Sequence, residues 1–268
     1  MERPKDLRTL GEVSREVHET AGGAPALPLR GRGRVILWDD TFVRYHEPHI
    51  GIAAVTVLEA LGFEVSLLKD RRCCGRPAFS QGNLDEAARL GRKNIELLSA
   101  GDASGPVLFL EPSCYSMFIE DYRELKLAGA GLIADRCFLF EKFVENILST
   151  EPDALQFREE QGEVAIHAHC HAKALMKPGF MVTLAGRLPG RKVTLLDTGC
   201  CGMAGAFGAL ESKYELSRKV AAPLVEQIGA QSSGATIVAS GTSCRHQIEH
   251  FTPVRPKHMA ELLAEALA

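Results

Sequence analysis

Short apolar runs alternate along this chain with longer segments whose apolar residues recur every three or four positions. The short runs predict strands, in order 35–38, 64–68, 106–110, 164–167, 192–196 and 236–239. The periodic segments predict helices at 51–61, 84–98, 138–148, 212–228 and 258–267. Asn83 suits the N-cap of the second of these, and Pro223 is expected to kink or split the fourth. This alternation predicts an α/β fold with parallel sheets and crossover helices.

A cysteine motif recurs in the two halves of the chain. Cys73-Cys74-Gly75 returns as Cys200-Cys201-Gly202, and each motif is followed by a helix, an apolar strand and a further cysteine. These later residues, Cys114 and Cys244, lie 40 and 43 positions after the second cysteine of each pair. Self-similarity of this length predicts two related units packed side by side. We assign residues 35–150 to the first CCG unit, residues 163–268 to the second, and residues 1–34 to an N-terminal extension with one weak helix and a linker.

Composition and charge restrict the class of protein. With 268 residues, 46% hydrophobic and 24% charged, the chain can bury one large core or two modest ones. Its formal net charge of −3 gives no basic excess to neutralise phosphates, so nucleic acid is not an expected partner. The apolar runs are far shorter than the ~20 residues of a membrane span, and residues 1–34 lack the apolar stretch of a secretory signal. We therefore expect a cytoplasmic protein.

The eight cysteines carry the candidate chemistry. A chain of this size without a leader is expected to keep its thiols reduced, and clustered thiols indicate metal or redox chemistry rather than a disulfide framework. Because the carboxyl ends of parallel strands meet at one sheet edge, the cysteines that follow the three strands of the second half are expected to converge there. They are Cys170, Cys200, Cys201 and Cys244. Four thiolates suit a soft metal or an iron–sulfur cluster.

Several alternatives stay open at this point. Four thiolates also suit tetrahedral zinc, with His169 and His171 as further nitrogen ligands. Some of the thiols could instead be small core residues, and the vicinal pair Cys200-Cys201 could exchange disulfides. Lys173 and Arg245 could bind sulfide or an anionic substrate, or be solvated charges.

The first unit is the weaker site. It offers three sulfurs, from Cys73, Cys74 and Cys114, and places Asp39, Asp40 and Thr41 where the second unit has Cys170. We take Asp40 as the fourth candidate ligand, so that the unit could hold a degenerate site, a different metal or none. Cys137 is interpreted as a structural residue that opens a helix.

The order of these motifs resembles a known family. They are Trp38-Asp39-Asp40-Thr41-Phe42, Cys73-Cys74-Gly75-Arg76-Pro77, Leu110-Glu111-Pro112-Ser113-Cys114, His169-Cys170-His171-Ala172-Lys173-Ala174, Gly199-Cys200-Cys201-Gly202-Met203-Ala204-Gly205 and Ser243-Cys244-Arg245. From Val35 onward the chain is similar to the duplicated cysteine-rich (CCG) domain of heterodisulfide reductase, of the iron–sulfur subunits of glycolate, lactate and glycerol-3-phosphate oxidoreductases, and of FAD-linked oxidases with a C-terminal iron–sulfur region. Met117 and Gln247 stand where the fullest family motif has a further cysteine.

The resemblance implies a [4Fe–4S]-type cluster on Cys170, Cys200, Cys201 and Cys244, with zinc as an option in the first unit. It also implies a component of an oxidoreductase that passes electrons between a flavin-linked 2-hydroxy-acid or disulfide site and an acceptor. The implied partners are flavoprotein and ferredoxin-type subunits, which could bring the chain to the inner face of the membrane. The alternative is a zinc-binding structural or assembly subunit without redox activity.

Overall fold

Two parallel β-sheets form the framework of the protein, in a computed structural model that describes residues 31–100 and 104–268. The first sheet has the strand order β2-β1-β3-β4 and the second β6-β5-β7. The strands are β1 (Arg34–Trp38), β2 (Glu64–Leu67), β3 (Val107–Phe109), β4 (Cys137–Leu139), β5 (Gly162–Ile166), β6 (Arg191–Leu195) and β7 (Thr236–Val238). The six strands expected from the sequence are all present, and the α/β class is confirmed.

Helices connect the strands in both halves. Those of the first half are α2 (Thr41–Tyr45), α3 (Pro48–Ala60), α4 (Arg76–Ser80), α5 (Leu84–Ser99), α6 (Pro112–Ser116), the π-helical turn η1 (Met117–Asp121), α7 (Tyr122–Glu124), α8 (Ala130–Ala134) and α9 (Phe140–Thr150). After the 3₁₀ turn η2 (Pro152–Ala154) follow α10 (Cys170–Leu175), α11 (Gly179–Ala185), the 3₁₀ turn η3 (Phe207–Ala209), α12 (Glu211–Gly229), α13 (Thr242–Phe251) and α14 (Met259–Ala266). Asn83 caps α5 as predicted, its side chain accepting from the Glu86 N–H.

The two halves repeat one topology, as the recurring motif predicts. Each central strand, β1 or β5, lies between the strand that follows it and the next one, in the same order in both sheets. The fourth strand β4 has only a trace of a counterpart, a single parallel bridge between Val238 and Lys257. Helices α9 and α14 then occupy equivalent places at the end of each repeat.

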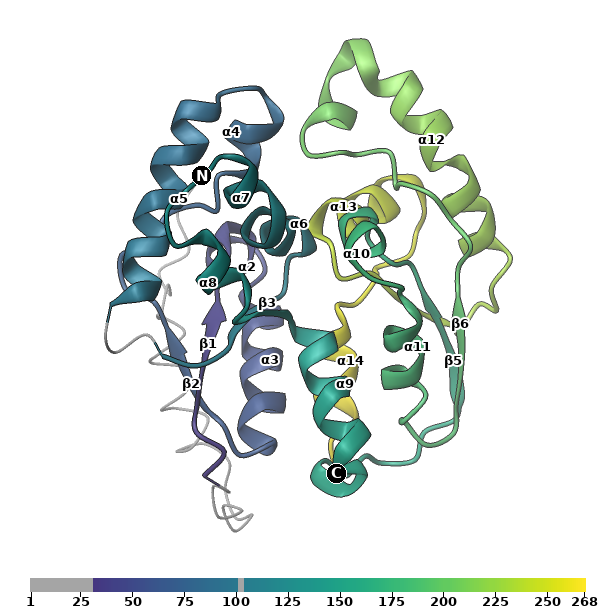
Figure 1. The fold of residues 1–268 in the computed structure, drawn as a ribbon. Coiled ribbons are helices and arrows are strands. Elements are labelled where there is room, and N and C mark those ends of the chain that lie inside the picture. Colours follow the sequence, from purple (N-terminus) through teal and green to yellow (C-terminus); the bar gives the residue numbers. More distant parts are fainter. Residues whose placement is uncertain (1–30, 101–103) are drawn as a thin grey trace, which may run out of the picture.

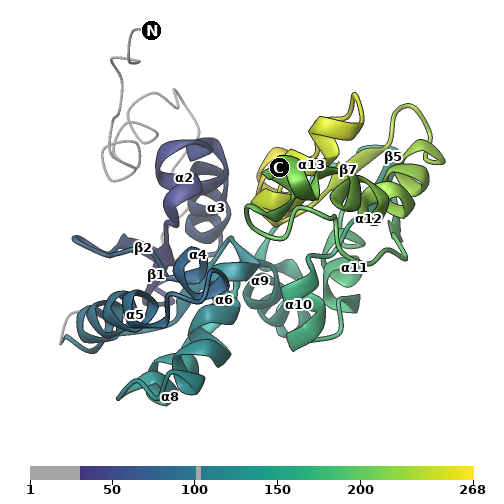
Figure 2. The same ribbon diagram turned by 90° about the horizontal axis from the view of Figure 1, so that it is seen from above.

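The repeats exchange these last helices. Helix α9 of the first repeat packs against α11 of the second, and α14 of the second packs against α3 of the first. Figure 1 shows these four helices in a layer between the two sheets, with α5 and α12 on the outer sides. Figure 2, seen from above, also places α9 between the two halves. One hydrophobic core consequently contains residues of both repeats, among them Leu37, Val57, Ile166 and Leu263.

One local expectation is wrong, and of the two outcomes expected at Pro223, a kink or a split, the split is wrong. Cys137 does not open a helix but begins strand β4, where it is buried and its thiol donates to the Ile133 carbonyl at 3.2 Å. Strand β4 runs directly into helix α9, which begins at Phe140, so the sequence has no break between them that would distinguish the strand from the helix. Pro223 does not split α12, which runs continuously from Glu211 to Gly229. Lys219, whose carbonyl loses its helical partner at this proline, is exposed to water.

The weak helix and linker expected at the N-terminus lie outside the described residues, apart from positions 31–34. Among the residues that are described, no helix is both long and apolar enough to cross a membrane.

Candidate metal centre

The structure brings the four cysteines of the second repeat together at the carboxyl edge of its sheet. Cys170 is the first residue of α10, after β5; Cys200 and Cys201 lie in the loop after β6; and Cys244 is in the first turn of α13, after β7. Their side chains form a continuous series of thiol contacts, from Cys170 to Cys200, from Cys200 to Cys201 and from Cys201 to Cys244. Three separate strand ends therefore deliver four neighbouring sulfurs.

Thiolate character alternates along this series. The pKa of Cys200 is lowered, first because the thiols of Cys170 and Cys201 donate hydrogen bonds to its sulfur. The pKa of Cys244 is lowered by the Cys201 thiol and also by the nearby His169 and His167. The donors Cys170 and Cys201 have raised pKa values because their protons are held between sulfurs. The cluster is thus arranged to carry negative charge on sulfur, the form that a soft metal binds.

The glycine of each CCG motif has a backbone reason. Gly75 and Gly202 have φ values of +91° and +89°, a conformation that residues with a Cβ rarely adopt. A Cβ at Gly202 would also lie 2.4 Å from the Ser217 carbonyl oxygen. The tight turn lets the Gly202 N–H donate to Cys200 Sγ at 3.3 Å. The motif therefore brings two adjacent cysteine side chains and one backbone N–H donor close together.

The strand register gives a residue-by-residue match between the repeats. Leu37 pairs with Leu108 in the first sheet, and Ile166 pairs with Val238 in the second. Aligning Cys114 with Cys244, each six positions after its strand residue, makes these two pairs equivalent. The same count matches Thr41, not Asp40, to Cys170, and it matches Asp40 to His169. The helix caps support this match, since the Asp40 and His169 side chains accept hydrogen bonds from backbone N–H groups at the starts of α2 and α10.

The first repeat gathers three sulfurs. Cys74 Sγ and Cys114 Sγ are 3.1 Å apart, and Cys73 is in hydrogen-bonding contact with Cys74. Asp40 is 2% exposed and accepts from the Phe42 and Val43 N–H groups with Oδ1, whereas its buried Oδ2 has no partner in the described part of the chain. Asp40 lies near enough to Cys114 to disfavour its thiolate.

In the first site all three thiols have raised pKa values, whereas in the second site the pKa is raised for two thiols and lowered for two. The pKa of Cys114 is raised: the Cys74 thiol acts against this, but burial and the carboxylates of Asp40 and Glu111 outweigh it. The pKa values of Cys73 and Cys74 are also raised, in each case first by a thiol–thiol hydrogen bond. The pKa of Asp40 is itself raised to about 7, mainly by burial and then by Glu111. Neutral thiols surrounded by acids thus face the histidine-rich site of the other repeat.

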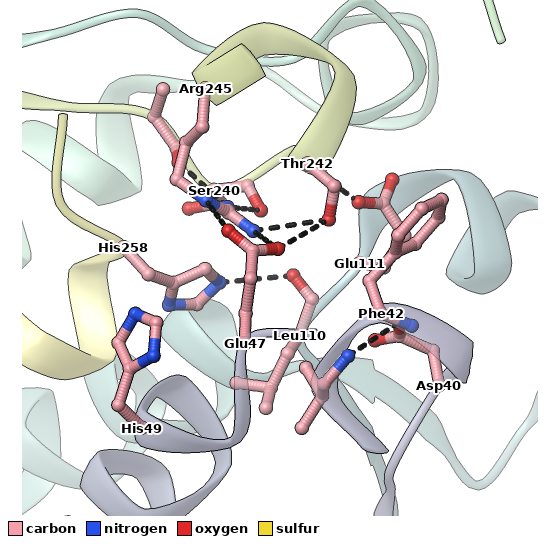
Figure 3. A network of polar contacts seen from close by, with 12 residues as sticks. Asp40, Phe42, Glu47, His49, Leu110, Glu111, Ser240, Thr242, Arg245 and His258 are labelled. Atoms are coloured by element: carbon pink, nitrogen blue, oxygen red, sulfur yellow. Dashed lines mark hydrogen bonds and ion pairs between the residues drawn. The ribbon is translucent and has the colours of Figure 1, made fainter. Parts of the chain in front are cut away.

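A network of buried polar contacts joins the two sites across the repeat boundary (Figure 3). Glu111 accepts from the Ser113 N–H at 3.0 Å with Oε1, and from the Thr242 N–H at 2.8 Å with Oε2. It thereby links the helix that carries Cys114 to the helix that carries Cys244. The imidazole Nε2 of His258 is 3.0 Å from the Leu110 carbonyl and its Nδ1 accepts from the Ala260 N–H, so Nε2 carries the proton.

The two basic residues next to the second cluster are structural. Arg245 is only 3% exposed, and all five of its N–H groups are used by Glu47, Thr242 and the carbonyls of Ala239 and Ser240. The expectation of a solvated charge is wrong for this residue, and no donor of Arg245 is left for sulfide or substrate. Lys173 donates to the Thr198 and Gly199 carbonyls and fixes the loop that leads into Cys200.

Several residues that shape the sites were missed by sequence reasoning. Asn94, which is fully buried, accepts from the Arg72 N–H and donates to the Cys73 carbonyl. In the second repeat, Ser217 donates to the Gly202 carbonyl and accepts from Gln247. Each comes from the helix after its CCG loop, where a single polar residue on an apolar face is the only signal that the sequence offers.

Comparison with known proteins agrees with the repeat. The profile of the cysteine-rich (CCG) domain matches residues 41–119 and again residues 164–249. The chain belongs to this family. It is 30% identical over 240 residues to one of the subunits of anaerobic glycerol-3-phosphate dehydrogenase of Escherichia coli, covering 88% of this chain and 60% of that protein. It is 27% identical over 233 residues to lactate utilization protein A of Bacillus pumilus, covering 81% of this chain and 93% of that one.

A third relative is a larger protein. D-2-hydroxyglutarate dehydrogenase of Pseudomonas putida is 26% identical over 244 residues, which cover 89% of this chain and 23% of the relative. The matched region of this chain thus spans most of lactate utilization protein A, three-fifths of the glycerol-3-phosphate dehydrogenase subunit and under a quarter of D-2-hydroxyglutarate dehydrogenase.

Proposed function

We propose that this CCG protein is an iron–sulfur electron-transfer subunit of an oxidoreductase, with Cys170, Cys200, Cys201 and Cys244 as the ligands of one [4Fe–4S]-type cluster. The observation that carries the proposal is the unbroken series of thiol contacts among these four residues. Four cysteine thiolates are the usual ligand set of such a cluster.

The donor set fits this group chemically. Two of the four thiols already favour the thiolate, and the Gly202 N–H points at one of the sulfurs. Once bound, the cluster would supply one-electron chemistry at a potential set by hydrogen bonds to sulfur and by solvent exposure. The chain's own part is to present the thiolates, to hold the Cys200 loop through Lys173 and to keep Cys201 and Cys244 away from water.

In the first repeat we propose a second and weaker site for a divalent ion such as zinc, with Cys73, Cys74, Cys114 and Asp40 as its donors. The unpartnered Oδ2 of Asp40 supports this assignment, because a buried oxygen without a hydrogen bond is costly. A carboxylate in the set favours a harder ion than an iron–sulfur cluster does. The strand register assigns Asp40 the place of His169 rather than that of Cys170, so the two sites are not copies of each other.

The assignment to a larger redox system is also part of the proposal. One relative is named as one subunit of a dehydrogenase, and another is a dehydrogenase of which this chain matches 23%. By analogy, electrons would pass from a flavoprotein partner acting on a small 2-hydroxy acid, or from a disulfide site, through the second repeat to a ferredoxin-type acceptor. The chain would then be a cytoplasmic component rather than a complete enzyme.

One observation favours a second candidate function, a zinc-binding structural or assembly subunit. Donor atoms of His169, Cys170 and His171 lie within 4.8 Å of one another. His169 Nδ1 already accepts from the His171 N–H at 3.1 Å, so a zinc ion bound at this nitrogen would have to break the helix cap.

Visible absorbance and bound iron of three variants, purified without oxygen, test the proposal. We expect Cys200→Ser to lose most of the iron and the absorbance, because it removes the sulfur in contact with two others. Cys137→Ser is the control, since it removes a buried thiol from outside both sites. Cys73→Ser should leave iron nearly unchanged. Unchanged iron in Cys200→Ser would contradict the ligand assignment, and equal losses in Cys73→Ser would show that the first repeat also carries iron.

A further inference from the structure

His167 occupies a special place beside the second cluster. It follows the last residue of β5, its backbone N–H donates to the Val238 carbonyl at 2.8 Å, and its side chain is 1% exposed. Within the described residues, no carboxylate, lysine or arginine side chain forms a hydrogen bond with its ring. It is therefore a buried imidazole that the sheet itself fixes in position.

The two ring nitrogens of His167 have different surroundings. Nδ1 lies 2.7 Å from the hydroxyl oxygen of Thr198. Nε2 is buried and has no hydrogen-bond partner within the described part of the chain, and the imidazole is a close neighbour of Cys244 that helps to lower the pKa of its thiol. A buried ring nitrogen without a partner costs free energy unless a ligand completes it.

The acceptor that Nε2 faces decides which nitrogen carries the proton. Thiolate and sulfide sulfurs accept hydrogen bonds, so only a protonated Nε2 can be satisfied at this place. Nδ1 must then be the acceptor, and the Thr198 hydroxyl must donate to it. Thr198 and His167 together form a short relay that aims one N–H at sulfur, as outer partners of metal ligands commonly do.

We propose that His167 donates a hydrogen bond from Nε2 to the sulfur of Cys244 in the loaded protein, and that this bond raises the reduction potential of the cluster. The inference rests on the proposed function. A hydrogen bond to sulfur offsets the negative charge that the cluster gains on reduction, so the reduced state is stabilised. His167 is thus a positioning and tuning residue, not a ligand.

The repeat supplies a matched control. By the strand register, Trp38 of the first repeat is the equivalent of His167, and it too is buried with a ring N–H that has no partner in the described chain. Trp38→Phe removes this N–H from the repeat that does not hold the proposed cluster. It should leave the potential of the cluster unchanged.

The test is a potentiometric titration, followed by visible absorbance, of the iron-loaded protein and its variants. At the midpoint potential of the wild type, His167→Leu should show about a tenfold lower ratio of reduced to oxidised cluster, which corresponds to about 59 mV for one electron. His167→Gln retains an N–H donor and should recover most of the shift. Thr198→Val should shift the potential in the same direction by less, because the tautomer is no longer fixed.

The outcomes separate the two proposals. A wild-type protein without iron would overturn the proposed function, and this inference with it. A loaded His167→Leu protein with the potential of the wild type would overturn the inference alone. If His167→Leu fails to hold iron, Thr198→Val decides, since an unchanged potential and unchanged iron–sulfur stretching frequencies in that variant contradict the relay.

Discussion

At the scale of single residues, the two repeats carry different side chains at two equivalent positions near the sulfurs. Asp40 of the first repeat occupies the place of His169 in the second, and Glu111 occupies the place of Gly241. The first exchange places a carboxyl beside the first set of thiols where the second set has an imidazole, and the second adds a further carboxyl near Cys114. The result is one scaffold whose two sites have different charged neighbours.

Gly241 is a position where a methyl group matters. Its φ is −80°, so the backbone is open to other residues, but a Cβ there would lie 2.1 Å from Cδ2 of His169. We predict that Gly241→Ala displaces the His169 ring and lowers the free energy of unfolding by about 1–3 kcal/mol, as overpacking does. Gly179→Ala, at an open position in α11, is the control and should be neutral or slightly stabilising. Urea unfolding of both variants measures the difference.

Glu141 is a second residue with a measurable signature. Burial raises its pKa to about 7, with a contribution from Glu111, although the Ser240 hydroxyl and Arg245 act against this. The unfolded chain loses this proton near pH 4.5, so the carboxyl makes the protein less stable as the pH rises from about 4.5 to 7. His258, whose pKa burial lowers to about 3, acts in the opposite direction below pH 6.5.

Comparison with Glu141→Gln isolates the carboxyl, because His258 is common to both proteins. We expect the variant to gain roughly 1–3 kcal/mol relative to the wild type between pH 5 and pH 8. Unfolding by urea at a series of pH values measures this gain. Parallel stability curves for the two proteins would show that Glu141 is ionised without penalty in the folded state.

At the scale of elements, segments bounded by turns or with a clear period were predictable, and those that merge with a neighbouring element were not. Strands β1 and β5 are largely buried, so their sequences are apolar runs. Helices α5 and α9 are buried on one face, so their apolar residues recur with the helical period. Strand β4 merges with α9 and helix α6 with the π-helical turn η1, so neither stands apart in the sequence. Helices α10 and α13 begin at cysteine motifs, where ligand spacing hides the helical pattern. The convergence of the sulfurs was accessible because strand direction alone determines it.

The contacts between elements were the least predictable part of the site. Glu47 and Arg245 are 198 positions apart, yet the guanidinium donates to both carboxylate oxygens, at 3.0 and 2.7 Å. No local pattern records such a pair. In the sequence Arg245 is only a charge next to a cysteine.

This ion pair gives a prediction at the same scale. Arg245→Met keeps the volume but leaves Glu47 and two carbonyls without their donor, so we expect a loss of about 2–4 kcal/mol. Part of the Glu47 side chain is exposed to water, which can solvate the carboxylate when the arginine is removed. We therefore expect the loss of unfolding free energy to lie near the lower end of this range. Arg218→Met is the control, because its pair with Glu215 is exposed. Thermal unfolding measures the stability of both variants. If Arg245→Met is as stable as Arg218→Met, the ion pair has no structural role.

At the scale of the whole molecule, the exchange of α9 and α14 makes the two repeats one folding unit. The single tryptophan, Trp38, lies in the first repeat, and Leu263 of the second is fully buried in the shared core. We predict that Leu263→Ala costs about 2–5 kcal/mol and shifts the transition reported by Trp38 fluorescence together with that reported by circular dichroism. Leu216→Ala, exposed on α12, is the control. A Trp38 transition that stays in place would show that the repeats unfold separately.

The central claim is that the second repeat binds an iron–sulfur cluster and not zinc. Iron, zinc and acid-labile sulfide per chain, measured together on the wild-type protein purified without oxygen, test it most directly. The account predicts about four iron and four sulfide per chain, with any zinc confined to the first repeat and therefore retained in Cys200→Ser. A colourless protein that contains zinc alone, and that loses this zinc in Cys200→Ser, would contradict it.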